Sequence, residues 1–150
     1  MGISNIWVFS QESNGTATSG TLELLTHARS LGGSVTAFVG GDASAIAGIL
    51  GEYGAIKVYA TGDLGGARPG AAVASAMKAV IDGGDSPDLI LFPQNYEGRD
   101  VMSRLSVKVD RTVLTNNVAV AVDGDTVTVT TPVFGGNTLV STSFSGSAPY

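Results

Sequence analysis

Residues 88–104 read DLILFPQNYEGRDVMSR and carry the clearest structural pattern in the chain. Leu89 to Phe92 form a short apolar run of the kind that makes a buried strand, and the polar residues after it indicate a turn. A helix that opens with Gly98, Arg99 and Asp100 is expected next. In open α/β sheets, ligands and partners bind beyond the carboxyl ends of the strands, beside a helix N-terminus. This segment is therefore the first candidate for a functional crevice.

Three strand–helix units precede this segment. The predicted strands are 6–10, 35–39 and 57–60; the predicted helices are 21–31, one with Asp42 as its N-cap, and one with Pro69 in its first turn. Residues 11–20 are rich in Gly, Ser and Thr and are predicted to form a loop. The alternation of strands and helices predicts a mainly parallel sheet with helices on both faces.

The pattern changes after residue 112. Residues 118–122 and 126–133 are predicted strands joined by an Asp-Gly turn signal at residues 123–125, and a third strand is expected at 139–144. The chain is therefore predicted to end in an antiparallel meander. The predicted fold class is α/β: a three-layer αβα sandwich with a mainly parallel sheet and antiparallel C-terminal strands.

Composition excludes several kinds of protein. The 150 residues fit one domain, and the absence of cysteine excludes disulfides and thiolate metal sites within it. Eight basic residues against 13 acidic ones, without a basic cluster, argue against a nucleic-acid surface. No apolar run approaches the ~20 residues that span a bilayer, so membrane insertion is not expected. No signal or transit peptide is recognisable, so a cytoplasmic location is expected.

The crevice residues allow two interpretations. Gly98 permits close backbone approach, Arg99 offers a planar fork for phosphate or carboxylate, and Asp100 accepts hydrogen bonds or holds the arginine. Alternatively, Asp100 is an ordinary acid of a first helical turn, paired with Arg104, and Arg99 is a surface residue. Without knowledge of a family the second interpretation is favoured.

Other chemical motifs are weak. The glycine pairs lack the spacing of phosphate-binding loops and are interpreted as turns and caps. His27 has no second ligand and is interpreted as a surface histidine, while Asp82, Asp85 and Asp88 are interpreted as solvated loop residues. No nucleophile has a base beside it in the pattern, so an enzyme is not expected and no catalytic or metal residue is assigned.

Three segments resemble a known family. They are TLELL at 21–25 with Ala28, Arg29 and Leu31; PDLILF at 87–92 with GRDVMSRL at 98–105; and TPVFGGNTLV at 131–140. In this order they resemble the electron transfer flavoprotein alpha subunit, over residues 6–144. Residues 106–110 and 114–118 and Asn137 depart from the family pattern, so Asn116 and Asn137 receive no transferred role.

The resemblance implies that residues 1–150 are the N-terminal α/β domain of such an alpha subunit. Its fold would be Rossmann-like, of the adenine-nucleotide-alpha-hydrolase type. In the family, FAD is held mainly by a C-terminal domain of the alpha subunit, which is absent from this chain, and AMP is held by the beta subunit. No cofactor is therefore expected in this chain alone.

The function implied is that of a scaffold. The chain would hold the heterodimer with the beta subunit together, in a carrier that takes electrons from flavin dehydrogenases, as in fatty acid oxidation, to a quinone oxidoreductase or similar acceptor. Gly98, Arg99, Asp100, Gly135 and Gly136 are the candidate crevice or interface residues. The alternative is a stand-alone adenine-nucleotide-binding module that uses the loops at 11–20 and 93–98. A homodimer of the isolated chain is also predicted.

Overall fold

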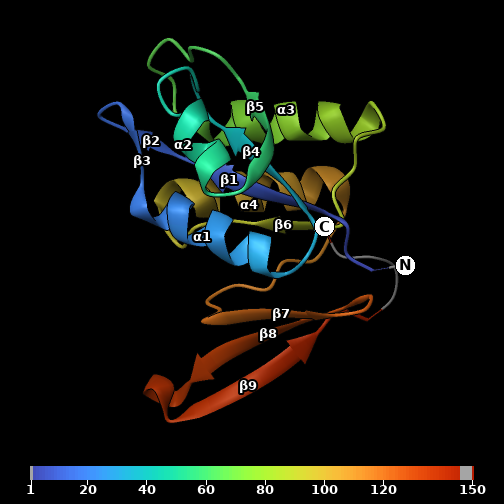
Figure 1. Ribbon diagram of the computed structural model, residues 1–150. Coiled ribbons are helices and arrows are strands. Elements are labelled where there is room, and N and C mark those ends of the chain that lie inside the picture. The colour runs from blue at the N-terminus through green and yellow to red at the C-terminus, as the bar shows by residue number, and fades with distance from the viewer. Residues whose placement is uncertain (1, 146–149) are drawn as a thin grey trace.

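The computed structural model describes residues 2–145 and residue 150. Figure 1 shows a parallel sheet with helices around it and a second, antiparallel sheet below. The parallel sheet has the order β5-β4-β1-β6. Its strands are β1 (Asn5–Ser10), β4 (Ser34–Val39), β5 (Ala55–Ala60) and β6 (Leu89–Leu91), and the helices are α1 (Ser19–Ser30), α2 (Ala47–Glu52), α3 (Pro69–Asp82) and α4 (Tyr96–Val109). A small hairpin of β2 (Glu12–Ser13) and β3 (Thr16–Ala17) follows β1.

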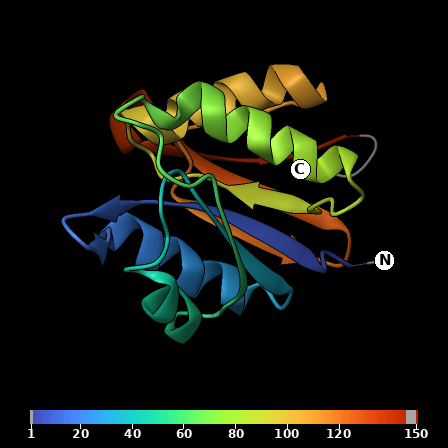
Figure 2. The same ribbon diagram turned by 90° about the horizontal axis from the view of Figure 1, so that it is seen from above.

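The parallel sheet is the middle of three layers. Alternate residues of β1 point to opposite faces, so Ile6 and Val8 join a core with α1 and α2. Trp7 and Phe9 join a second core with α3 and α4. The two helix pairs lie on opposite sides of the sheet in Figure 2. The predicted three-layer α/β fold is confirmed.

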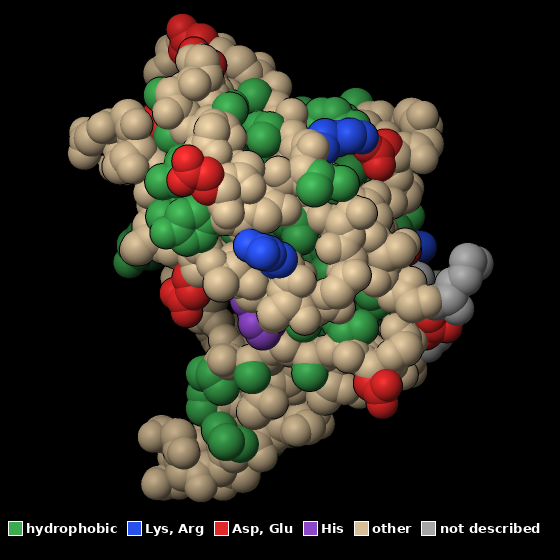
Figure 3. All heavy atoms as spheres, in the orientation of Figure 1, with side chains coloured by type: hydrophobic (Ala, Val, Ile, Leu, Met, Phe, Trp, Pro, Cys, Tyr) green, Lys and Arg blue, Asp and Glu red, His purple; other side chains and the backbone are tan. Residues whose placement is uncertain are grey.

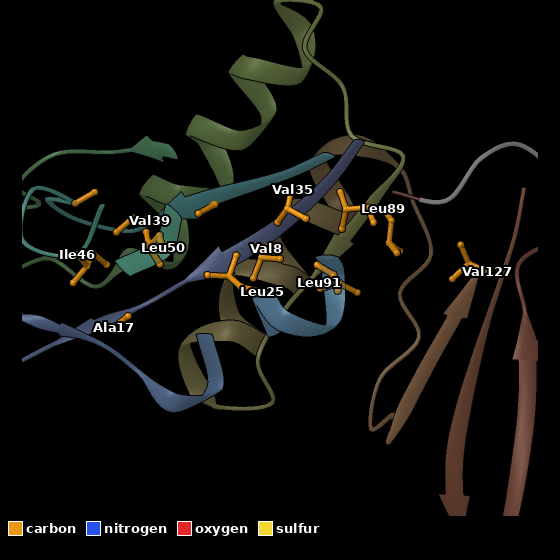
Figure 4. Packing of buried hydrophobic residues seen from close by; sticks show 14 residues of the cluster. Val8, Ala17, Leu25, Val35, Val39, Ile46, Leu50, Leu89, Leu91 and Val127 are labelled. Atoms are coloured by element: carbon orange, nitrogen blue, oxygen red, sulfur yellow. The ribbon is translucent and has the colours of Figure 1, made fainter. Parts of the chain in front are cut away.

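The last strands form a separate sheet. It consists of β7 (Ala119–Asp123), β8 (Thr126–Val133) and β9 (Thr138–Ser143), antiparallel throughout, with the 3-10 turn η1 (Phe134–Gly136) between β8 and β9. The predicted hairpin and third strand are therefore present. Val127 and Val129 on β8 are buried, and Figure 4 shows Val127 reaching toward Leu89 of β6. Val127 and Leu89 belong to the same hydrophobic core, on the α1 side of the parallel sheet.

Three predicted helix starts were wrong, because local hydrogen bonds place each start elsewhere. The helix α4 begins at Tyr96 rather than at Gly98, with the Asn95 side chain as its cap. The region 11–20 contains the small hairpin, and α1 starts at Ser19 behind the cap residue Thr18. Asp42 does not cap α2; its carboxylate accepts from the N–H and hydroxyl of Ser44 in the turn before the helix.

Candidate functional site

The topological switch point of the parallel sheet lies between β1 and β6, because the chain leaves β1 toward β4 and later returns to β6 on the other side. Ligand crevices of open α/β sheets form at such a point, beyond the carboxyl ends of the strands. Here it is bounded by the loop after β1 and by the loop between β6 and α4. The predicted segment 88–104 supplies one of these two walls.

Gln11 bridges the two loops at this point. Its side-chain N–H donates to Glu97 at 2.6 Å, and its side-chain carbonyl accepts from the Asn95 amide at 2.6 Å. Its backbone N–H donates to the Thr21 hydroxyl at 2.8 Å, and its backbone carbonyl accepts from Thr18 N–H at 3.0 Å. Gln11 thus occupies the space between the loops and ties both to α1 and α4.

The two helix N-termini beside Gln11 are capped by the chain itself. Asn95 accepts from Gly98 N–H at 2.8 Å at the start of α4. Thr18 accepts from Thr21 N–H at 3.3 Å at the start of α1. A capped N–H is satisfied and is not available to an anion. Sequence reasoning missed Gln11 and Asn95; the signal for Asn95 was an Asn three residues before Gly98.

Gly98 acts through close packing rather than through a turn. A Cβ atom at this position would lie 2.1 Å from the backbone carbonyl oxygen of Pro93. Gly98 is buried in the first turn of α4, and its φ lies outside the left-handed region. The absent side chain therefore lets α4 start directly against the end of β6.

Arg99 and Asp100 point to different parts of the molecule. Asp100 pairs with Arg104 at 2.7 Å, as the sequence indicated, and lies against Gly70 of α3. Arg99 is exposed and lines a cavity on the other side of α4. The structure does not bring these two side chains together in one crevice, because neighbouring residues on a helix are about 100° apart.

Carboxylates line a second depression, beyond the ends of β1, β4 and β5. It measures about 430 Å³, and its charged lining residues are Glu12, Asp42, Asp63 and Glu97. Each of the four accepts a hydrogen bond, from Gly15, Ser44, Gly65 and Gln11 respectively. The bonds from Ser44 hold the pKa of Asp42 below its usual value. The depression is acidic at neutral pH and repels a phosphate.

An apolar cavity lies between the two sheets. It measures about 700 Å³ and is bounded by β6, α4, the connection 111–118 and the inner face of the antiparallel sheet. Most of its surface is apolar, with Leu91, Met102 and Leu114 among the lining residues. The Arg111 guanidinium lies 4.6 Å from the ring centre of Tyr150 at its border, and Ile90 N–H donates to the Tyr150 carbonyl.

The aspartates near β6 are structural rather than solvated. Asp88 accepts from the N–H groups of Ser4 and Asn5 at 2.8 and 2.9 Å, and from the Ser4 hydroxyl. Burial raises the pKa of Asp88, but these hydrogen bonds outweigh it and the pKa lies below its usual value. Asp85 binds Lys57 at 2.7 Å and the Tyr59 hydroxyl at 2.6 Å, which lowers its pKa.

Asp82 and His27 are the remaining residues that were weighed as metal ligands in the sequence. Asp82 pairs with Lys78 one turn earlier in α3, so the three aspartates form no common cluster. Among the residues that the structure describes, no group of His, Cys, Asp or Glu is placed to hold a metal ion. The His27 ring lies between α1 and the antiparallel sheet, with Nε2 2.8 Å from the Val120 carbonyl oxygen. It is half-buried and joins the two layers.

Gly135 and Gly136 lie in η1, between the last two strands, as expected. Both have positive φ, of 68° and 91°, a conformation that favours glycine. They are far along the chain from Gly98, at the end of β8 and β9 that Figure 1 shows away from the helices. Their interface role remains a prediction.

Comparison with known proteins agrees with this fold. A family model described as "Electron transfer flavoprotein domain" matches residues 6–149. The chain belongs to the electron transfer flavoprotein family. The electron transfer flavoprotein subunit alpha of Syntrophomonas wolfei is 31% identical over 143 residues, which are 93% of this chain and 44% of that relative. The resemblance to the N-terminal domain of an alpha subunit is thereby confirmed.

The chain spans less than half the length of that relative. No helix within the described part of the chain is long and apolar enough to cross a membrane.

Proposed function

We propose that this chain is the scaffold domain of an electron transfer flavoprotein alpha subunit, and that it binds a beta subunit without holding the flavin itself. The complete carrier would take electrons from flavin dehydrogenases and pass them to a quinone oxidoreductase or similar acceptor. FAD would be held mainly by a further domain of the alpha subunit, and AMP by the beta subunit. No residue of this chain would take part in the electron transfer.

The observation that carries the proposal is the bridge made by Gln11. A dinucleotide in an open α/β sheet places its phosphates at the switch point, against free N–H groups of a helix N-terminus. Here Gln11 joins Asn95 and Glu97 across that point, and Asn95 caps α4. This arrangement supports a domain that does not itself bind the phosphates of FAD or AMP at the switch point.

The acidic depression argues in the same direction. Its four carboxylates and the absence of Lys and Arg from its lining disfavour an anionic ligand. The alternative function, a stand-alone adenine-nucleotide-binding module, requires the loops at 11–20 and 93–98 to bind the nucleotide. These are the two loops that Gln11 joins. That alternative has no observation in its favour.

Co-purification tests the proposal. The chain, alone and followed by the C-terminal part of an alpha subunit, is expressed with a cognate beta subunit, and complex mass and visible flavin absorbance are recorded. We expect both forms to bind the beta subunit and only the longer form to be yellow. Flavin or AMP in the short chain purified without a beta subunit, found by mass spectrometry after denaturation, would contradict the proposal.

A further inference from the structure

Trp7 is the one tryptophan of the chain and leaves a polar group unpaired in the core. It lies on β1 and is fully buried in the core between the parallel sheet and the helices α3 and α4. Among the residues that the structure describes, none accepts a hydrogen bond from its indole N–H. Buried donors are normally paired, so an unpaired one calls for an explanation.

Two aromatic rings connect Trp7 to the edge of the parallel sheet. The strands β1, β4 and β5 are neighbours (Figure 1), and Phe38 of β4 is paired with Tyr59 of β5. The ring centres of Trp7 and Phe38 are 5.5 Å apart, and those of Phe38 and Tyr59 are 5.4 Å apart. Trp7 also lies 6.0 Å from the Tyr59 ring centre. These are distances of rings in contact, so a continuous aromatic path leads from the core to half-buried Tyr59.

Tyr59 ends this path beside a carboxylate. Its hydroxyl donates to Asp85 at 2.6 Å, and Lys57 binds the same carboxylate at 2.7 Å. The hydrogen bonds from Lys57 and Tyr59 hold the pKa of Asp85 below its usual value, so Asp85 is ionised at neutral pH. Acidic side chains lie scattered over the face shown in Figure 3. Of the four tyrosines, only Tyr59 donates its hydroxyl to a carboxylate within the described residues.

The two ends of the path differ in where a proton can go. Loss of one electron makes an indole N–H or a phenol O–H strongly acidic. Trp7 has neither an acceptor nor contact with water, so its radical cation keeps the proton and remains a strong oxidant. Tyr59 passes its proton to Asp85 as it loses an electron, and Lys57, 5.2 Å from the ring centre, disfavours a positive charge on the ring. A hole on Trp7 therefore moves to Tyr59 and ends there as a neutral radical.

We propose that Trp7, Phe38 and Tyr59 form a path that carries a one-electron oxidation out of the core to the edge of the sheet. A one-electron oxidant, such as an oxygen-centred radical, takes up an electron from Trp7. Tyr59 then gives one electron to Trp7 and its hydroxyl proton to Asp85, which restores Trp7 and leaves a phenoxyl radical. A thiol in solution returns a hydrogen atom to that radical and becomes a thiyl radical, and Asp85 releases its proton to water.

This reaction is separate from electron transfer through a flavin, and it does not depend on the proposed function. Phe38 is not oxidised in it. The Phe38 ring fills the space between the other two rings, so that the electron crosses only rings in contact. The path protects the core, because the oxidised group ends at the sheet edge, where a reductant reaches it.

The single tryptophan makes the path directly testable in the unchanged chain. Light at the long-wavelength edge of tryptophan absorption photoionises Trp7, and nitrous oxide with tert-butanol removes the ejected electron. Transient absorption then follows the radicals. We expect the band of the Trp7 radical cation to decay as the phenoxyl band of tyrosine rises. A deprotonated indole radical as the first product, or a radical that stays on Trp7, would contradict the proposal.

Matched tyrosine variants identify the end of the path. Tyr59→Phe keeps the ring and removes the hydroxyl, whereas Tyr53→Phe makes the same change at an exposed tyrosine of the turn after α2. Tyr59→Phe should lose the phenoxyl band and lengthen the lifetime of the Trp7 radical cation. Tyr53→Phe should behave like the unchanged chain, and urea unfolding checks that both variants fold. A phenoxyl band of equal size in Tyr59→Phe would overturn the proposal.

Asp85→Asn tests the proton acceptor. The asparagine side chain still accepts a hydrogen bond from Tyr59, but it does not take up the proton, so the phenoxyl radical should form more slowly. Asp82→Asn is the control, because Asp82 pairs with Lys78 one turn earlier in α3. It should leave the rate unchanged. Equal rates in the two variants would show that the proton goes elsewhere, and the assignment of Asp85 would be wrong.

Discussion

The strand β1 at the centre of the parallel sheet and the outer strand β9 of the antiparallel sheet differ most in the burial of their residues. Five of the six residues of β1 are buried, whereas five of the six residues of β9 are exposed. β1 has a strand on each side and helices on both faces, while β9 has one neighbour, β8. The parallel part thus supplies its own core, whereas the outer strand of the antiparallel sheet is largely exposed.

The difference predicts unequal local stability. Regions with few buried apolar contacts open at a lower free energy than a packed core. Val127 of the antiparallel sheet belongs to the core on the α1 side, Val120 and Val122 pack against that core, and His27 contacts the Val120 carbonyl. The body is held by two cores and by the Asp88 bonds between β6 and the start of β1. Substitutions in the two regions should therefore differ in size and in which amides they affect.

The largest effect is expected in the body, for Gly98→Ala. The new methyl group would lie 2.1 Å from the Pro93 carbonyl oxygen, and a backbone atom cannot move aside as a flexible side chain does. We expect the free energy of unfolding to fall by about 3 kcal/mol, the upper range for overpacking. Urea unfolding followed by circular dichroism measures it.

Gly48→Ala is the matched control. Gly48 lies in α2, and a Cβ atom there would have nothing within 4 Å. This exchange should raise the free energy of unfolding by about 0.5–1 kcal/mol, because alanine favours the helix. If Gly98→Ala unfolds at the same urea concentration as the unchanged chain, the junction of β6 and α4 is looser than the contact indicates.

The fold was predictable because its signals are local and repeated. Apolar runs such as Leu89 to Leu91 and the helical spacing in α3 and α4 each have one simple interpretation. The Asp-Gly turn before Thr126 predicted the hairpin directly. The sequence did not predict that the last strands form their own sheet. That depends on the burial of Val127 in the core on the α1 side, whose other residues are distant from it in sequence.

The candidate site was less predictable, because it depends on contacts across the sheet. Arg99 and Asp100 are adjacent in sequence, yet they lie on different sides of α4. Gln11 meets Asn95 and Glu97 only because β1 and β6 are neighbours, although 84 and 86 residues separate them along the chain. Asn95 had a recognisable capping pattern, while Gln11 had no local signal.

Val127→Ala tests whether the two regions differ in stability as argued. Val127 is 2% exposed and joins the antiparallel sheet to the body, so its truncation should cost about 1–2 kcal/mol. We expect faster hydrogen exchange in β7, β8 and β9, and unchanged exchange in β1. Val133→Ala, at the half-exposed far end of β8, is the control and should have a smaller effect. Equal loss of protection in β1 would mean that both sheets unfold as one unit.

Phe134→Gly should change the stability least, and it should stabilise the chain, whereas Gly98→Ala and Val127→Ala should destabilise it. Phe134 has a φ of 50°, in the left-handed region that bulky residues avoid, and its exposed ring packs little against its own chain. Glycine relieves this strain, so the free energy of unfolding should rise by about 0.5–1 kcal/mol. Asn116→Gly, at a φ of 58°, is the control and should gain less, because asparagine tolerates this conformation.

The sign of the effect shows whether the exposed ring contributes to the fold. If Phe134→Gly instead destabilises the chain by about 1 kcal/mol or more, as loss of a packed side chain does, the ring contributes to the fold. Phe134 would then be part of the antiparallel sheet's own packing, and the contrast between a packed body and an exposed sheet would be weaker at this end.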